Sequence, residues 1–178
     1  QIGDDTQSYV VLNVPRRCGW IDLVAESAIL KHKLLASLGL EPLGNSFSAA
    51  RLEAAFKGRS VHVKNALLNQ ALIAGIGNIY ANEALFLSGI SPRRKAGNIT
   101  GGRAERLAIA IVTTLRTAIE DGGTSLRDHV QPGGEIGYFV QRLAVYGQAG
   151  KPCPRCTSLI KTITQSGRSS FYCSRCQR

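Results

Sequence analysis

Apolar side chains recur at helical spacing over much of the chain between residues 25 and 120. Residues 25–38 have this spacing and predict a first helix. A second helix is predicted over 49–56, because Ser48 is a residue type that caps helix N-termini and Gly58 is a typical helix stop. A longer helix is predicted over 103–120. The body of the protein is therefore expected to be mainly α-helical.

The densest helical pattern lies between residues 63 and 89. It breaks at Gly75-Ile-Gly77, and Asn78 starts a second periodic stretch, so the pattern predicts a helix, a glycine turn and a helix. The two glycines have two open interpretations. They mark an ordinary helix stop, or they let a phosphate approach the backbone N–H groups at the start of the next helix, where the helix dipole favours an anion. Spacing alone favours neither.

The N-terminal residues have a different pattern. Residues 8–14 are rich in β-branched and aromatic side chains and predict a strand, but only the turn-like Gly3-Asp4-Asp5 precedes them. A strand without partners indicates that the chain begins within a domain. We therefore expect it to be the C-terminal part of a longer protein.

The strongest chemical signal is a pair of CxxC motifs near the C-terminus. Sixteen residues separate Cys153-Pro-Arg-Cys156 from Cys173-Ser-Arg-Cys176, a spacing typical of one Zn²⁺ held by four thiolates. Disulfides and unrelated buried thiols are the alternatives, but no secretory signal is present and Cys18 lies far from the others. Four thiolates leave no open position for catalysis. We expect one structural zinc ion. The same set of four thiolates also fits iron.

Composition favours a globular basic protein. The chain has 178 residues, 44% of them hydrophobic, with 22 Lys and Arg against 12 Asp and Glu, a formal charge of +10. Four thiolates and one Zn²⁺ lower this figure to about +8. The last 28 residues contain six of the cations and no Asp or Glu. This charge indicates either a ribosomal-type or simply soluble basic protein, or a nucleic-acid footprint concentrated at one end.

Several stretches together resemble formamidopyrimidine-DNA glycosylase, and the resemblance covers residues 15–178 in the family's order. It is similar to that family's helix-two-turn-helix domain and zinc finger, while the N-terminal β-sandwich is almost wholly absent. The matching stretches are Lys64-Asn-Ala-Leu-Leu-Asn-Gln70, Ala74-Gly-Ile-Gly-Asn-Ile-Tyr-Ala-Asn-Glu-Ala-Leu-Phe86, Gly122-Gly-Thr-Ser-Leu-Arg-Asp128, Gly137-Tyr-Phe139, Val145-Tyr-Gly147 and the four-cysteine hairpin.

The resemblance implies a mainly α fold: a helix-two-turn-helix body, then a small zinc-binding β-hairpin, with a remnant strand of the β-sandwich. The implied domains are 1–24 for the remnant and the Pro-Arg-Arg loop, 25–147 for the helical DNA-binding domain, and 148–178 for the zinc finger. The implied partner is double-stranded DNA with a damaged base or an abasic site. A bacterial cytoplasmic monomer without membrane attachment is expected.

Site residues are carried over one by one from the resemblance. Lys64 and Asn78 match positions that hold the phosphates flanking the lesion, and Arg168 matches the zinc-finger arginine that clamps the same backbone. Arg16 matches the arginine inserted into the space left by the flipped nucleotide, where it meets the orphan cytosine. Residues 131–138 resemble the loop that closes over the extruded oxidised purine. Without the resemblance, Arg16 would be expected to form a surface ion pair, and Asn78 to be a helix N-cap.

The chain departs from the family pattern at three positions. Val14 and Asn69 stand where the family usually has Asp, and Cys18 stands where it has a Phe wedge. A thiol lacks the flat apolar area that buckles a base step, so we expect lesion interrogation to be weakened or rearranged.

The residues that perform the chemistry of the resembled family have no counterpart in this sequence. That family uses an N-terminal proline amine to attack the sugar C1′ and an adjacent glutamate to move protons. Gln1 is a poor substitute, and nothing around Lys64 in the sequence indicates the desolvation that would lower its pKa. We expect the damaged-DNA-binding portion of a base-excision DNA glycosylase/AP lyase, inactive by itself. The alternatives are a non-enzymatic zinc-ribbon DNA-binding or scaffold protein and, more distantly, an RNA-binding ribosomal accessory protein.

Overall fold

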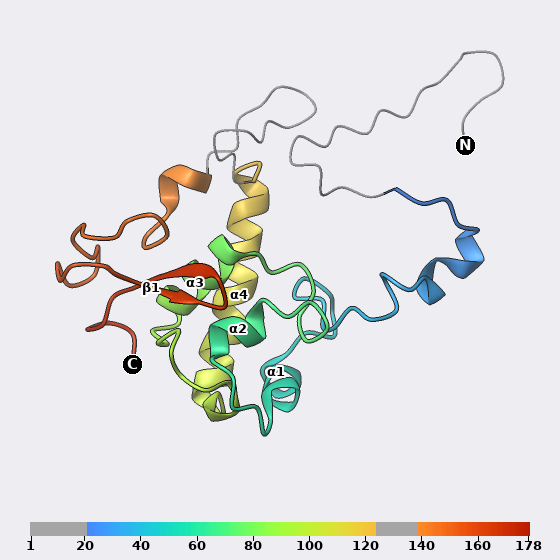
Figure 1. The fold of residues 1–178 in the computed structure, drawn as a ribbon, viewed down its shortest axis with the longest axis horizontal. Coiled ribbons are helices and arrows are strands. Elements are labelled where there is room, and N and C mark those ends of the chain that lie inside the picture. Colours follow the sequence, from blue (N-terminus) through green and yellow to red (C-terminus); the bar gives the residue numbers. More distant parts are fainter. Residues whose placement is uncertain (1–20, 124–138) are drawn as a thin grey trace, which may run out of the picture. The chain divides into compact units, whose positions relative to one another are not determined.

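The computed structural model describes residues 21–123 and 139–178 (Figure 1). The chain divides into two compact units, Gln1–Ala36 and Ser37–Arg178. The predicted strand at 8–14 and the segment 124–138 lie outside the described residues.

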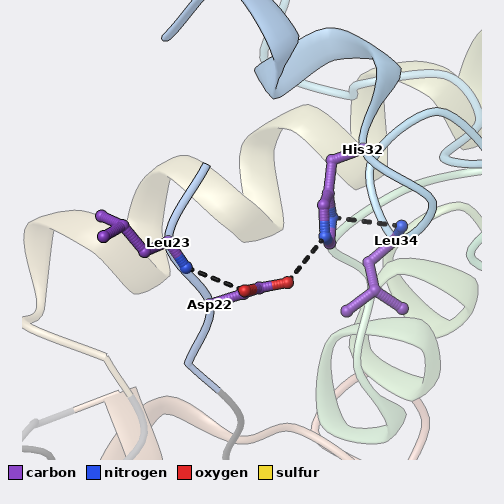
Figure 2. Close-up of polar contacts among 4 residues, drawn as sticks. All are labelled: Asp22, Leu23, His32 and Leu34. Atoms are coloured by element: carbon purple, nitrogen blue, oxygen red, sulfur yellow. Dashed lines mark hydrogen bonds and ion pairs between the residues drawn. The ribbon is translucent and has the colours of Figure 1, made fainter. Parts of the chain in front are cut away.

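In the first unit, the helix predicted over 25–38 is wrong in length and type. Only a short 3-10 helix, η1 (Glu26–Lys31), forms, and none of its residues is buried. A helix with an apolar face gains most of its stability by packing that face against other elements. Since η1 buries no side chain, it lacks this stabilisation. Polar contacts join residues of this segment: Asp22 Oδ2 lies 3.2 Å from His32 Nε2, and His32 Nδ1 accepts a 3.4 Å bond from Leu34 N (Figure 2).

The second unit begins with the helices that the apolar pattern predicts. Helix α1 (Ala49–Phe56) has its predicted bounds, and Ser48 Oγ accepts the N–H of Arg51 at 3.3 Å as its cap. Helix α4 (Gly102–Glu120) matches the prediction to within one residue. Between them lie α2 (Val63–Leu67), α3 (Asn78–Leu87) and the 3-10 helix η2 (Ala96–Asn98), and η3 (Phe139–Arg142) follows.

The core of this unit lies where α3 and α1 pack against α4 (Figure 1). Each helix contributes one apolar face, including Leu52 and Phe56 from α1, Leu85 from α3, and Leu107 and Ile111 from α4, all at most 1% exposed. Burial of a large apolar side chain contributes about 1.5–3 kcal/mol, so this face sets the position of α3.

The predicted helix, glycine turn and helix are confirmed, but α2 is shorter than the apolar spacing suggests. It ends at Leu67, although Leu68, Ala71 and Leu72 continue the pattern. Two side chains compete with the helix by bonding to the local backbone. Asn69 Oδ1 accepts the N–H of Ala71 at 3.0 Å, and Gln70 Oε1 accepts the N–H of Gly75 at 2.8 Å.

A two-stranded antiparallel hairpin, β1 (Lys161–Gln165) and β2 (Arg168–Tyr172), follows the helices. Ser166 and Gly167, both with positive φ, form its two-residue turn, the geometry that matches the twist of hairpin strands. Gln165 pairs with Arg168, which places Arg168 directly after the turn. The mainly α fold with a C-terminal β-hairpin is therefore confirmed. Among the described residues, no helix is long and apolar enough to cross a membrane.

Candidate metal centre and nucleic-acid interface

The four cysteines of the CxxC motifs converge on one point beside the hairpin. Their Sγ atoms all lie within 4.8 Å of one another, with Cys153 and Cys176 3.9 Å apart and Cys156 and Cys173 3.4 Å apart. Zn–S bonds of about 2.3 Å place the sulfurs of a tetrahedral site about 3.8 Å apart. The donor set and its spacing therefore fit one Zn²⁺, with all four positions taken by protein.

The surroundings of the thiols favour a cation. Hydrogen bonds from Ser158 lower the pKa of Cys156 to about 6, whereas the neighbouring Cys156 thiol raises the pKa of Cys176 to about 12. Burial raises the pKa of Cys173. Four thiolates this close repel one another, so all four ionise together only with a positive ion among them. A divalent ion lets every sulfur act as a thiolate ligand.

The first CxxC turn docks onto the C-terminus of α3. Arg155 donates to the carbonyl of Phe86 at 2.9 Å and to that of Leu87 at 3.1 Å, and its guanidinium lies 4.5 Å from the Phe86 ring centre. These are carbonyls that a helix end leaves without an intrahelical partner, where a cation is favourable. The metal centre is therefore fastened to the helical body through Arg155.

Two residues predicted from the sequence donate to one backbone oxygen of the hairpin, and a third directly precedes that oxygen in the chain. The carbonyl of Ser169 accepts hydrogen bonds from Lys64 Nζ at 2.8 Å and from Asn78 Nδ2 at 3.3 Å. Arg168, the residue before it, is exposed. Lys64 on α2, Asn78 on α3 and Arg168 on β2 thus form one cluster, which we call the Ser169 cluster.

Lys64 is buried at the base of this cluster, with 0% of its surface exposed. Burial and, as the smaller cause, the positive charge of Arg168 lower the pKa of Lys64 from 10.5 to about 8. The sequence-based expectation that Lys64 is not desolvated is therefore wrong. The neighbours in the sequence are ordinary helix residues, and the hairpin that covers Lys64 begins almost a hundred residues later.

Asn78 is not the N-cap of α3. Gly77 takes that position without a side-chain bond, and Asn78 is the first helical residue, which frees its side chain to reach Ser169. Gly75 has φ +78°, which explains its glycine by conformation. Gly77 has an ordinary φ of −92°, and a Cβ there would meet only Tyr80 at 4.0 Å. An outside group can therefore come close to the backbone at Gly77.

Sequence reasoning missed three polar residues that join α2 and α3 to later parts of the chain: two of them bond to the finger, and the third bonds to residues 144–146. Asn65 Nδ2 donates to Ser166 Oγ at 2.9 Å, and Asn82 Oδ1 accepts the N–H of Phe171 at 2.6 Å. The Glu83 carboxylate accepts the backbone N–H groups of Ala144, Val145 and Tyr146 at 2.8–3.0 Å. The available signal was two polar residues inside the apolar run of α3, where a buried carboxylate or amide needs partners.

Arg16 and the loop 131–138 lie outside the described residues. Phe86 and Phe139 are buried, and Tyr80 packs edge-on against Phe139 with ring centres 5.6 Å apart. The interpretation of these rings as core is confirmed for both phenylalanines.

Comparison with known proteins agrees with this architecture. Residues 38–130 match the family model described as "Formamidopyrimidine-DNA glycosylase H2TH domain", and residues 150–178 match "Zinc finger found in FPG and IleRS". The chain belongs to the formamidopyrimidine-DNA glycosylase family. In this family context the four cysteines form a zinc finger that holds one structural zinc ion.

Individual members of the formamidopyrimidine-DNA glycosylase family match over most of the chain. The enzyme of Ruegeria sp. (strain TM1040) is 53% identical over 98% of the chain and 62% of its own length. The crystal structure of MutM (Fpg) from Thermus thermophilus is 42% identical, with a TM-score of 0.77 over 81% of this chain and 55% of that one. A complex of Lactococcus lactis Fpg with DNA containing an abasic site is 31% identical, with a TM-score of 0.80 over 87% and 57%. The chain therefore spans about three fifths of the length of its curated relatives.

The zinc centre predicts a local dependence of folding on metal. The purified protein should contain one zinc per chain, and Cys153→Ser should lose it and unfold the finger while the helical body stays folded, because metal binding and folding are coupled at the ligands. Metal analysis and NMR spectra of the two regions measure this. Cys18→Ser, at the fifth cysteine, is the matched control and should keep the zinc. A folded hairpin free of zinc under reducing conditions would contradict the assignment.

Proposed function

We propose that this chain is the damaged-DNA-binding portion of a DNA glycosylase/AP lyase that acts on oxidised purines. The observation that carries the proposal is the Ser169 cluster, where Lys64, Asn78 and Arg168 come together on a finger without acidic residues. In this proposal the three residues hold consecutive backbone phosphates beside the lesion. Arg16 fills the space left by the extruded base, and residues 131–138 close over that base.

Electrostatics support an anion at the Ser169 cluster. The Lys64 ammonium has its pKa lowered by burial and by Arg168, so a negatively charged partner would offset both effects. Lys64 uses one of its N–H groups on Ser169, which leaves the others for a phosphate oxygen. The Asn78 amide uses one of its two N–H groups on Ser169 and keeps the other for a phosphate, and the first-turn backbone N–H groups of α3 add further donors.

The cluster joins three elements, and this favours bending of the bound duplex. Phosphates drawn to α2, α3 and β2 together are brought closer than in a straight duplex, which helps to expose a base. These contacts position the backbone and carry no sequence information of their own. Recognition of the damaged base is therefore assigned to Arg16 and residues 131–138.

The chemistry of excision is not assigned to any residue of this sequence. Lys64 is the amine of the Ser169 cluster, but its Nζ already donates to the Ser169 carbonyl at 2.8 Å, and the cluster contains no acidic residue that could donate a proton. A nucleophile must reach the sugar C1′ with a proton donor beside it. We therefore assign Lys64 to phosphate binding. The division into regions 1–24, 25–147 and 148–178 is part of the same proposal.

Salt dependence tests the phosphate contact of Arg168. Arg168→Ala should reduce the slope of log K against log salt by about one unit on a duplex with an abasic-site analogue, because one phosphate contact is lost. Fluorescence anisotropy at several salt concentrations measures it. Arg175→Ala, an exposed arginine of the same finger outside the cluster, is the control and should change the slope less. An unchanged slope and affinity in Arg168→Ala would refute the role of Arg168.

The lowered pKa of Lys64 predicts a pH dependence of DNA binding. As pH rises from 7 to 9, the ammonium deprotonates through its pKa of about 8, so affinity should fall, approaching tenfold per pH unit above the pKa. Lys64→Arg keeps its charge and should flatten the profile, and Lys64→Met should be weak and flat. A pH dependence that persists in Lys64→Met would assign it to another group.

The same shift gives a stability prediction of defined sign. The folded pKa lies below the unfolded value of 10.5, so the buried ammonium destabilises the fold below pH 8. Relative to Lys64→Met, wild-type stability should rise as pH increases from 8 to 10.5. Urea unfolding at these pH values measures it.

Covalent trapping tests the assignment of chemistry. A polypeptide of these 178 residues should bind duplex with an abasic site but give no adduct on borohydride reduction, because Lys64, the amine of the Ser169 cluster, is assigned to phosphate binding and donates to Ser169. Denaturing electrophoresis of the reduced mixture measures it, with a full-length relative as the positive control. An adduct that survives blocking of the Gln1 amine would assign the chemistry to an internal lysine and overturn the proposal.

A further inference from the structure

A polar cavity of about 670 Å³ lies where the loop between α3 and α4 meets the end of the zinc finger. Five of its lining residues come from the loop and lie within 91–98, and the other three come from the finger and are Ser174, Gln177 and Arg178. No Asp or Glu is among the described residues that line it. The cationic and amide side chains of its lining are Arg93, Arg94, Lys95, Asn98, Gln177 and Arg178.

The positive charges of this cavity have no local counter-charge from acidic side chains. The sequence has no Asp or Glu between Glu83 and Glu105, and none after Glu135. Among the described residues, the ion pairs lie elsewhere, at Asp22 with His32 and Asp121 with Arg142. Like charges gathered in one hollow repel one another, and an anion placed among them removes that cost.

Backbone and side-chain hydrogen bonds hold the two walls of the cavity together. The backbone oxygen of Arg178, the last residue of the sequence, accepts the N–H of Ser91 at 3.3 Å and Arg94 Nε at 3.3 Å. Gln177 Nε2 donates to the carbonyl of Ile90 at 2.9 Å, while its Oε1 accepts the N–H of Cys173 at 2.8 Å. The second CxxC turn is thus tied to the loop, and the backbone segments that carry the cations are held together before any ligand binds.

The loop that lines the cavity also contacts both sides of the Ser169 cluster. Arg94 O accepts the N–H of Val63, the residue before Lys64, at 2.7 Å. Pro92 O accepts Gln165 Nε2 at 3.2 Å, and Gln165 pairs with Arg168 across the hairpin turn. The loop between α3 and α4 therefore joins the cavity to the elements that carry Lys64 and Arg168.

We propose that this cavity binds a backbone phosphate of the same nucleic acid, in addition to the phosphates held by the Ser169 cluster. The inference rests on the proposed DNA-binding function. Guanidinium groups present several N–H donors in a plane and bind phosphate oxygens in pairs, so Arg93 and Arg178 are suited to the phosphate and Lys95 adds a point charge. The site extends the footprint along the backbone without reading sequence.

The test uses the double variant Arg93→Gln/Lys95→Gln, because both side chains are exposed and neither makes a side-chain hydrogen bond that joins the described elements. On a single duplex with an abasic-site analogue, the slope of log K against log salt should fall by about one unit, and affinity at low salt should fall with it. The matched control is Arg103→Gln/Arg106→Gln on α4, which makes the same charge change outside the cavity and should change the slope less.

The outcomes separate this inference from the proposed function. If Arg168→Ala lowers the slope and Arg93→Gln/Lys95→Gln does not, the cavity proposal is wrong and the proposed function stands. If neither variant changes DNA binding, both fail. If the double variant removes only a second, weaker binding event at excess DNA, the cavity meets another molecule, and contact with the same backbone is refuted. If the double variant and the α4 control lose the same amount of slope and affinity, the effect comes from net charge alone, and the cavity proposal is wrong.

Discussion

The free edge of β2 depends on hydrogen bonds from α3. A two-stranded hairpin leaves backbone groups of its outer edge without strand partners. Here the Ser169 carbonyl is bonded by Asn78, and the N–H of Phe171 is bonded by Asn82. Residues four apart on a helix rise about 6 Å, and residues two apart on a strand span about 6.6 Å, so the two amides match the two backbone groups. Helix α3 thus supplies hydrogen-bond partners that a third strand would otherwise supply.

This arrangement makes the zinc finger part of the helical body. The metal centre holds the hairpin in shape, Arg155 joins one CxxC turn to the end of α3, and Gln177 joins the other to the following loop. Loss of the metal would therefore disorder the hairpin and displace the Ser169 carbonyl, which positions the side chains of Lys64 and Asn78. A structural ion shapes the Ser169 cluster in this way without contacting its side chains.

Charge is distributed to favour a polyanion over internal ion pairing. The cations of the finger and of the loop 91–98 have no acidic residues near them in sequence, and Lys64 is buried beside Arg168. Such clusters destabilise the isolated fold, and bound phosphates offset that cost. The same uncompensated charge supports both the proposed DNA contacts and the additional cavity site.

The sequence by itself determined the local features of the protein: the cysteine spacing indicates the metal, and the Ser48 cap with the apolar period sets the bounds of α1. Only the tertiary structure decided how distant features meet. Lys64 and Ser169 are 105 residues apart, so no local pattern reveals the burial that lowers the Lys64 pKa. Asn69 helps to end α2 early through a side-chain hydrogen bond, which the apolar spacing does not predict. Asn78 does not cap α3, and its side chain donates to the distant Ser169 carbonyl. Apolar periodicity can be found in the sequence because it repeats over neighbouring residues. Hydrogen bonds between polar groups far apart in the sequence leave no such pattern, so only the packed structure shows them.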